Sequence, residues 1–302
     1  METVYIFHHN DLDGYSAAAV VYQVYRDATK YNVVFRKLTF PTTEEMFSMK
    51  DDNALVYIVD YSFTDKTADI LESVINRSKY VWWYDHHKST IENLDIFNTM
   101  KEKYKDKFEF VIDNDRSGAL IAYDEILINR NPPDKRPDRS RFILLVDDYD
   151  RWVHQYAPDD INLNSGMMFS GLYLKLKNRK WRHLIRGTEE YDDELQYIIN
   201  CGSIINEYDE RRYDILKRNI SYEREFEGYK CLVMNSDGNS RAFGDKIYEY
   251  DIVILWKYDG NIYTYSLYTV SEVIDCADIC RRHGGGGHKG AAGFTSKEFL
   301  FK

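Results

Sequence analysis

The stretch Tyr84-Asp85-His86-His87 determines how the rest of the chain is interpreted. It closes a short apolar run over residues 80–84, which has the length and composition of a buried strand. A carboxylate and two imidazoles at the end of such a strand are groups that bind divalent cations. The alternative is a surface turn with two exposed histidines. Metal binding is favoured only if further histidines and aspartates follow other predicted strands and helices.

Similar groups do recur at the ends of other predicted elements. They are His9, Asp11 and Asp13 after a strand over residues 4–7, Asp60 after an apolar run over residues 54–59, and Asp147, Asp148 and Asp150 after a helix over residues 139–146. Two cations that share one bridging carboxylate need about this many ligands. Taken singly, each group has a structural explanation, because aspartate also forms turns and helix caps.

The order of the predicted elements favours one fold class. Strands are predicted over residues 4–7, 32–36, 54–59, 80–84 and 108–112, and helices over residues 15–25, 64–76, 117–128 and 139–146. This alternation is typical of an α/β fold with a doubly wound, mostly parallel sheet. Ligands bind beyond the carboxyl ends of the strands in such a sheet, so groups far apart in the chain converge on one edge. This convergence carries more weight than any single motif.

The remainder of the chain predicts a second domain. Residues 1–186 form the larger α/β domain, residues 187–224 a polar helical linker, and residues 225–302 a smaller α/β domain. In the smaller domain, strands are predicted over residues 230–235, 252–257 and 262–267, and a helix over residues 275–283.

The chain is acidic, with a formal net charge of −10. Because phosphate neutralisation supplies most of the affinity for long nucleic acids, no extended duplex partner is expected. A small anionic substrate remains compatible, since bound cations reverse the local charge.

The N-terminus lacks a basic leader and no apolar run approaches the roughly 20 residues that span a bilayer. A cytoplasmic protein without a membrane partner is therefore predicted, and a homodimer is left open.

Four consecutive glycines, residues 284–287, precede His288 and Lys289. Backbone N–H groups without a neighbouring Cβ can cradle phosphate, and the two side chains add donors. A flexible linker is the alternative. The small residues that follow, Gly-Ala-Ala-Gly at 290–293, favour a close-packed loop.

Together these motifs resemble those of the DHH phosphoesterases. That family includes the RecJ exonucleases, nanoRNases, bisphosphonucleotide phosphatases, cyclic-dinucleotide phosphodiesterases and family II pyrophosphatases. The matching pieces, in the family's order, are His9-Asn10-Asp11-Leu12-Asp13-Gly14, Val59-Asp60, Asp85-His86-His87, Asp147-Asp148-Tyr149-Asp150 and GGGGHKGAAGF at 284–294. The last is similar to the signature of the DHH-associated C-terminal domain. Five ordered motifs are specific for the family and much less so for the substrate.

The resemblance implies two divalent cations, with manganese favoured and magnesium or cobalt as alternatives. The first would be bound by His9, Asp11 and Asp60, and the second by Asp13, Asp60, His86 and Asp148. Asp147 is the alternative to Asp148 in the fourth motif. By the same resemblance His87 contacts the scissile phosphate, and Asp85 is grouped with it as catalytic.

The resemblance also implies hydrolysis by a water activated between the two metals, with no covalent nucleophile. The residues expected to hold the substrate lie in the C-terminal domain and are Gly285, Gly286, Gly287, His288, Tyr268 and Arg282. Many relatives carry Ser-Leu-Arg-Ser where this chain has Ser266-Leu267-Tyr268-Thr269. Tyr268 cannot clamp a phosphate as arginine does, so it is expected to stack on a base.

The expected substrates are short oligonucleotides, dinucleotides or nucleotide bisphosphates, which makes the chain a phosphoesterase of the oligoribonuclease type. The alternatives are a cyclic-dinucleotide phosphodiesterase, a RecJ-like single-strand exonuclease, and a nucleotide-binding module without turnover. The intact ligand set disfavours the last of these. The glycine motif disfavours an inorganic pyrophosphatase.

Overall fold

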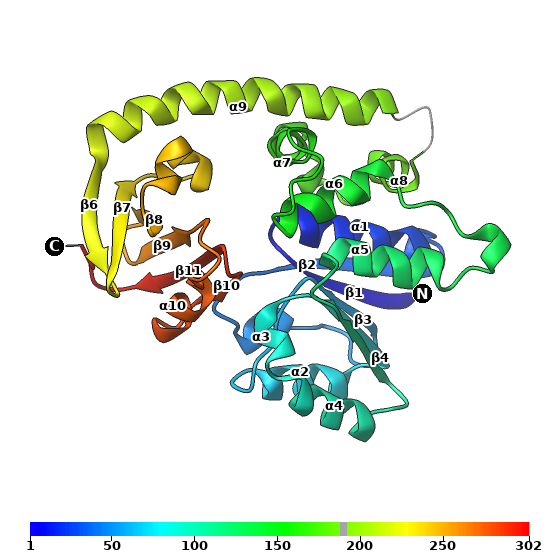
Figure 1. Ribbon diagram of the computed structural model, residues 1–302. Coiled ribbons are helices and arrows are strands. Elements are labelled where there is room, and N and C mark those ends of the chain that lie inside the picture. Colours follow the sequence, from blue (N-terminus) through cyan, green and yellow to red (C-terminus); the bar gives the residue numbers. More distant parts are fainter. Residues whose placement is uncertain (188–191, 302) are drawn as a thin grey trace. The chain divides into compact units, whose positions relative to one another are not determined.

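The computed structural model describes residues 1–187 and 192–301. The chain forms two compact units, Met1–Ser203 and Ile204–Lys302. The boundary between them falls within the long helix α9 (Asp192–Ile220), inside the segment 187–224 predicted as a linker. Of that segment, residues 188–191 lie outside the described residues. Each unit contains one sheet (Figure 1).

The sheet of the first unit is entirely parallel, which confirms the predicted fold class. Its strands are β1 (Glu2–His9), β2 (Tyr31–Leu38), β3 (Leu55–Val59), β4 (Tyr80–Asp85) and β5 (Phe108–Ile112). They are arranged in the order β2-β1-β3-β4-β5. Two separate apolar cores cover its two faces, which is the doubly wound arrangement. Since both faces are covered, the central strands β1, β3 and β4 contain continuous apolar runs, whereas the edge strands β2 and β5 include charged residues.

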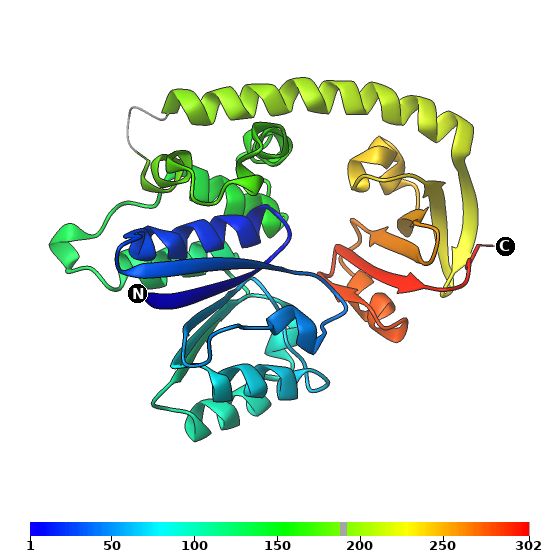
Figure 2. The same cartoon turned by 180° about the vertical axis from the view of Figure 1, so that it is seen from behind.

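Helices pack on both faces of this sheet (Figures 1 and 2). One face carries α1 (Leu12–Tyr25), α5 (Gly118–Tyr123), α6 (Arg141–Asp150), α7 (Asp159–Ser170) and α8 (Arg179–Arg186). The other face carries α2 (Ala68–Arg77) and α4 (Leu94–Lys103), and the short helix α3 (Lys88–Ile91) follows β4. A π-helical turn over Asp124–Ile128 extends α5.

The strand order reverses between β1 and β3, and this point positions the candidate site. His9 ends β1 and Asp60 directly follows β3. The two strands pair in parallel, with His8 opposite Val59. Ligands bind at the carboxyl ends of the strands where such a reversal opens a crevice.

Two helices differ from the sequence prediction in ways that affect the site. Helix α1 begins at Leu12, three residues earlier than predicted, because the Asp11 side chain accepts a hydrogen bond from the Gly14 N–H and caps the helix. Asp13 therefore lies in the first helical turn and not in an extended turn. Helix α6 continues to Asp150, so the acidic cluster expected to follow it is its last turn.

The second unit contains a mixed six-stranded sheet, which confirms a second, smaller domain of this class. Its strands are β6 (Ser221–Phe226), β7 (Tyr229–Asn235), β8 (Ile252–Tyr258), β9 (Tyr263–Tyr268), β10 (Gly286–Gly287) and β11 (Ala291–Ser296). The order is β10-β11-β9-β8-β7-β6, with only β7 and β8 parallel. Helix α10 (Cys276–Arg282) shares an apolar core with one face. Strands β6, β10 and β11 were not predicted from the sequence.

Within the first unit, α7 and the start of α9 approach each other closely at two glycines. A Cβ on Gly202 would lie 1.8 Å from the Asn162 carbonyl oxygen, and one on Gly166 would lie 1.9 Å from the Ile198 carbonyl oxygen. Real Cβ atoms do not come this close, so the two backbones can pack only with glycine at both positions.

We therefore expect Gly202→Ala to lower the free energy of unfolding by about 1–3 kcal/mol, the usual cost of overpacking a close contact. Gly171→Asn, at the C-terminal end of α7, is the matched control, because nothing lies within 4 Å of a Cβ there and asparagine tolerates its positive φ. Urea unfolding of both variants measures the difference. Equal stability of Gly202→Ala and the unaltered chain would show that the two helices are not held at this distance.

Candidate metal centre

Asp60 lies at the centre of the candidate site. Its Oδ1 is 3.2 Å from His86 Nε2 and 4.0 Å from His87 Nδ1, and its Oδ2 is 3.8 Å from His9 Nδ1. The backbone of Asp60 has φ 53°, and its N–H donates to the Tyr84 carbonyl at 2.8 Å. Left-handed backbone at a residue other than glycine costs about 1–3 kcal/mol and persists where the surrounding structure enforces it. The chain thus holds this carboxylate between imidazoles from two different strand ends.

Three sets of potential ligands contain Asp60; one of them joins it to Asp85 and His87, and the other two contain the residues predicted to bind metal. His9, Asp11 and Asp60 form one, and Asp13, Asp60 and His86 the other, with the ligand atoms of each set within 4.8 Å of one another. Every residue predicted to bind the metals, except Asp148, belongs to one of these sets, and each set could hold a cation. A carboxylate common to both sets is the arrangement that a pair of bridged metal ions requires.

Unsatisfied oxygens test whether cations fit here. Asp13 Oδ2, Asp60 Oδ2 and Asp150 Oδ2 are buried and have no hydrogen-bond donor among the residues that the structure describes. Buried polar atoms almost always have partners, so three orphaned carboxylate oxygens in one place are unusual. Hard divalent cations prefer oxygen and imidazole ligands, so the donor set fits them.

The raised pKa values of the clustered carboxyls also indicate a cation site. Burial, followed by repulsion from Asp150, raises the pKa of Asp13 to about 7. Burial and repulsion from Asp11 raise the pKa of Asp150 to about 7, and the same two causes raise that of Asp60 well above its usual value. Without cations, these carboxyls would therefore take up protons near neutral pH.

The pKa of Asp11 is lowered, in contrast to those of Asp13 and Asp150. Burial alone would raise its pKa, but His9 and the Gly14 N–H lower it below the ordinary value. The His9 Nδ1 atom lies 2.5 Å from Asp11 Oδ2, and Gly14 N–H donates to Oδ1 at 2.9 Å. A Cβ on Gly14 would lie 2.4 Å from the His9 carbonyl oxygen, so glycine is required for this turn.

Asp85 orients His87. Asp85 Oδ1 lies 2.7 Å from His87 Nδ1, and Thr90 donates to Oδ2. Although burial opposes both shifts, His87 lowers the pKa of Asp85 to about 2, and Asp85 raises the pKa of His87 to about 9. Asp85 thus favours the cationic form of His87 and holds its ring in a fixed orientation. Both Asp85 oxygens are engaged, so its role is positioning.

The structure places the aspartates of the fourth motif differently from what the prediction assumed. Asp148, chosen from the sequence as a ligand, accepts hydrogen bonds from the N–H groups of Gln155 and Tyr156 at 3.1 and 2.8 Å, and so closes the turn after α6. Asp147, the alternative, accepts from the Ser117 N–H at 2.6 Å. The carboxylate that lies 3.2 Å from His86 Nε2 is Asp150. Three aspartates within four residues look alike in sequence, and only the helix that contains them separates their directions.

Sequence reasoning missed Gly118. A Cβ there would lie 2.6 Å from Asp60 Cβ and 2.9 Å from Asp13 Oδ2. The next residue, Ala119, donates its N–H to Asp13 Oδ1 at 2.9 Å. The start of α5 therefore packs directly against both carboxylates. The only signal was a glycine directly after the helix-capping Ser117.

The residues predicted to hold substrate all lie in the second unit and are described within it. Gly286 and Gly287 form β10, and a Cβ on Gly285 would lie 2.1 Å from the Gly293 carbonyl oxygen, so the glycine loop is closely packed. Tyr268 ends β9 opposite Ala291, and burial raises its pKa to about 12.

Two further predicted residues flank this loop. Arg282 donates to Glu227 at 3.1 Å, so its guanidinium already has a carboxylate partner. His288 begins the turn back into the sheet, with its N–H bonded to the Ala291 carbonyl at 2.8 Å. The contribution of these six residues to substrate binding remains a prediction.

No helix within residues 1–187 and 192–301 has both the length and the apolar character needed to cross a membrane.

The first part of the chain is similar to a known protein family. Residues 3–144 match the model of the DHH family, N-terminal domain. A search of curated proteins finds no match.

Solved structures share the fold along nearly the whole chain. The DHH domain of a protein described as a member of a family of ribosomal proteins matches with a TM-score of 0.62 and 12% identity, covering 97% of this chain and 82% of that one. The pGpG-specific phosphodiesterase PggH from Vibrio cholerae gives a TM-score of 0.51 and 12% identity, covering 98% and 94%. RecJ from Thermus thermophilus, solved with Mn²⁺, gives a TM-score of 0.50 and 15% identity, covering 99% of this chain and 50% of that one.

At these identities the structural likeness shows the fold, and the family match covers the part of the chain that carries His9, Asp13, Asp60 and His86. The family, the shared carboxylate and the unsatisfied oxygens agree with one another. Residues 3–144 therefore form a DHH-family N-terminal domain, and this domain makes the chain a metal-dependent phosphoesterase.

Proposed function

We propose that the chain is a manganese-dependent hydrolase of short oligonucleotides, dinucleotides or nucleotide bisphosphates. The observation that carries the proposal is Asp60, a single buried carboxylate common to two sets of potential ligands. His9, Asp11 and Asp60 would hold one cation, and Asp13, Asp60, His86 and Asp150 the other. When bound, such a pair supplies Lewis acidity for activating water and neutralising phosphoryl charge.

The chain's own contribution to catalysis is charge and orientation. His87 has its cationic form favoured by Asp85, which also fixes its ring and is itself fixed by Thr90. An oriented cation beside the ligand sets suits contact with a phosphate oxygen, on which negative charge accumulates in the transition state. The buried surroundings strengthen this interaction, because little water screens it.

The choice of substrate rests on charge and on the neighbours. A chain with net charge −10 suits a short anion held locally better than long nucleic acid. PggH is a pGpG-specific phosphodiesterase and RecJ was solved with Mn²⁺, and both share this fold. The closely packed glycine loop would present backbone N–H groups to the nucleotide.

The test is a panel assay with added manganese, comparing short RNA, linear and cyclic dinucleotides, a nucleotide bisphosphate, single-stranded DNA and pyrophosphate. Asp60→Asn is the inactive control, because asparagine tolerates the backbone at this position. Fastest turnover of short RNA, the linear dinucleotide or the bisphosphate supports the proposal. Preference for the cyclic dinucleotide, long single strands or pyrophosphate would contradict it.

Substitution of Asp150 and substitution of Asp148 should have different effects on activity, metal binding and stability. Asp150→Asn should reduce hydrolysis by about 10²-fold or more, as for loss of an electrostatic contact to the reacting charge, and should weaken manganese binding. It should leave the metal-free chain at least as stable, because a repelling carboxylate is removed. Asp148→Asn should instead lower the thermal midpoint, since its oxygens accept two backbone N–H bonds. Calorimetric titration with Mn²⁺ and thermal unfolding distinguish the two, and a stronger loss of metal affinity in Asp148→Asn would reverse the assignment.

The metal-free chain should become less stable as pH rises. The folded-state pKa values of Asp13 and Asp150 are raised from 3.8 to about 7, so the folded chain holds protons that the unfolded chain has lost. Their stabilising contribution is complete below pH 3.8 and disappears as pH rises through 7. Manganese competes with those protons, so the gain in melting temperature on adding it should be larger at about pH 7.5 than at about pH 5.5. A gain that is equal at both values would show that these carboxyls do not bind the metal.

His87→Asn should lower kcat by about 10²- to 10³-fold, the usual cost of losing one preorganised group, while manganese affinity stays within a few-fold. Asp85→Asn should shift the alkaline limb of the rate profile to lower pH, because Asp85 holds the pKa of His87 at about 9. Initial rates between about pH 6 and pH 10 measure both effects. An unchanged profile in Asp85→Asn would exclude a role for the His87 charge.

A further inference from the structure

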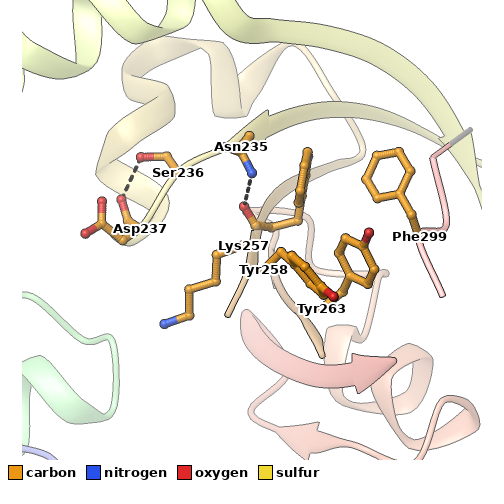
Figure 3. A pocket seen from close by; sticks show the side chains of 8 residues that line it. Asn235, Ser236, Asp237, Lys257, Tyr258, Tyr263 and Phe299 are labelled. Carbon is orange, nitrogen blue, oxygen red and sulfur yellow. Dashed lines mark hydrogen bonds between the residues drawn. The ribbon is translucent and has the colours of Figure 1, made fainter. Parts of the chain in front are cut away.

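The second unit contains an aromatic hollow that the proposed metal chemistry does not use. Its volume is about 610 Å³. Four rings line it, from Trp256 and Tyr258 on β8, Tyr263 on β9, and Phe299 in the C-terminal segment. Lys257 and residues 235–237, at the end of β7, complete the lining (Figure 3). We call this site the aromatic hollow.

The rings of the hollow form a ladder. Tyr258 and Tyr263 are directly opposite each other in the β8–β9 pair, with ring centroids 4.5 Å apart and planes at 27°. Tyr263 and Trp256 both lie near Phe299, at 5.5 and 4.7 Å. Trp256 Nε1 donates to the Tyr222 hydroxyl at 3.0 Å, which fixes the indole ring. Cross-strand pairing therefore holds these faces in place before any ligand arrives.

The ladder is open to solvent at one end. Tyr258 is 51% exposed, and its hydroxyl donates to the Gly260 carbonyl at 2.7 Å, so the exposed ring is tethered. A ring that served only the core would be covered. Fixed, exposed aromatic faces are surfaces on which nucleobases stack without sequence preference.

Polar groups at the hollow suit a nucleotide. Within residues 1–187 and 192–301, Lys257 has no ion-pair partner, and its side chain is exposed. Asn235 donates its amide N–H to the Trp256 carbonyl at 3.2 Å, which leaves the amide oxygen to accept from a base edge. The Asp237 carboxylate faces Arg212 at 3.3 Å, so its charge is partly offset. Lys257 alternates with Trp256 and Tyr258 along β8, so its ammonium lies off the ring faces (Figure 3), where it suits the phosphate of an anionic ligand and not the base.

We propose that the aromatic hollow binds an unpaired nucleobase of a single-stranded oligonucleotide substrate, by stacking on Tyr258 and Tyr263, while Lys257 contacts the adjoining phosphate. This assignment rests on the proposed function, because it requires the substrate to be an oligonucleotide. It adds a binding contact outside the metal centre, so it should act on substrate affinity.

The experiment measures binding of a fluorescein-labelled hexanucleotide to the full chain by anisotropy, in EDTA so that no turnover occurs. Tyr258→Ala should weaken binding about five- to fiftyfold, as for loss of one base–aromatic stack, and Tyr258→Phe should restore it. Lys257→Ala should weaken binding less and lower the slope of log affinity against log salt by about one. Tyr248→Ala is the matched control, because Tyr248 is 75% exposed in the same unit and lies outside the hollow.

Hydrolysis assays with manganese separate this proposal from the function on which it rests. In Tyr258→Ala, KM for the hexanucleotide should rise while turnover of a generic aryl phosphate ester stays unchanged. Unchanged hexanucleotide binding in both Tyr258→Ala and Tyr263→Ala would remove the hollow as the site, with the proposed function intact. If the unaltered chain hydrolyses nucleotide bisphosphates but binds no RNA or DNA hexanucleotide, the hollow assignment fails and the metal centre stands. If it hydrolyses no nucleotide at all, both proposals fail.

Discussion

The first unit is organised around the repulsion between buried carboxylates. Asp13 and Asp60 are buried, Asp150 is largely covered, and the three come from different parts of the chain and meet beside His86, where little water screens them. Each sits on a backbone that the core fixes independently, so the carboxylates cannot move apart. The repulsion is relieved either by protons or by cations. Folding and metal binding are therefore linked. The surrounding apolar layers provide the stability that offsets the repulsion in the polar centre.

Aspartates have two different functions in this centre. The hydrogen-bond donors around each carboxylate determine which function it has. Asp85 receives bonds from His87 and Thr90, and Asp148 from two backbone N–H groups, so both are satisfied as anions. Asp13, Asp60 and Asp150 each retain an oxygen without a donor among the described residues. Carboxylates whose donors are complete hold the structure in place. Those with an open oxygen remain available to a ligand. Asp148 and Asp150 show this difference only two residues apart on one helix.

Much of this fold could be predicted from the chain alone, and the reasons are local. The strands β1, β3 and β4 contain short apolar runs that end at polar residues, so their positions and the edge on which His9, Asp60 and His86 converge follow from the pattern. Which fourth-motif aspartate lies beside His86 could not be predicted, because it depends on α6 continuing through Asp150 and on which N–H groups the following turn offers. Gly118 was missed for a similar reason, since its requirement arises from a contact with Asp60 that only the folded chain makes.

The positive φ of Asp60 bears on how such a chain could change over evolution. Asparagine and glycine adopt this backbone conformation more readily than most residues, so replacing Asp60 with either would relieve strain while removing the shared anion. The step from a hydrolase to a protein without turnover would then carry no folding penalty at this position. Loss of turnover in descendants of this chain would thus be expected to begin at residue 60, with the sheet and the second unit retained for a new role in recognition.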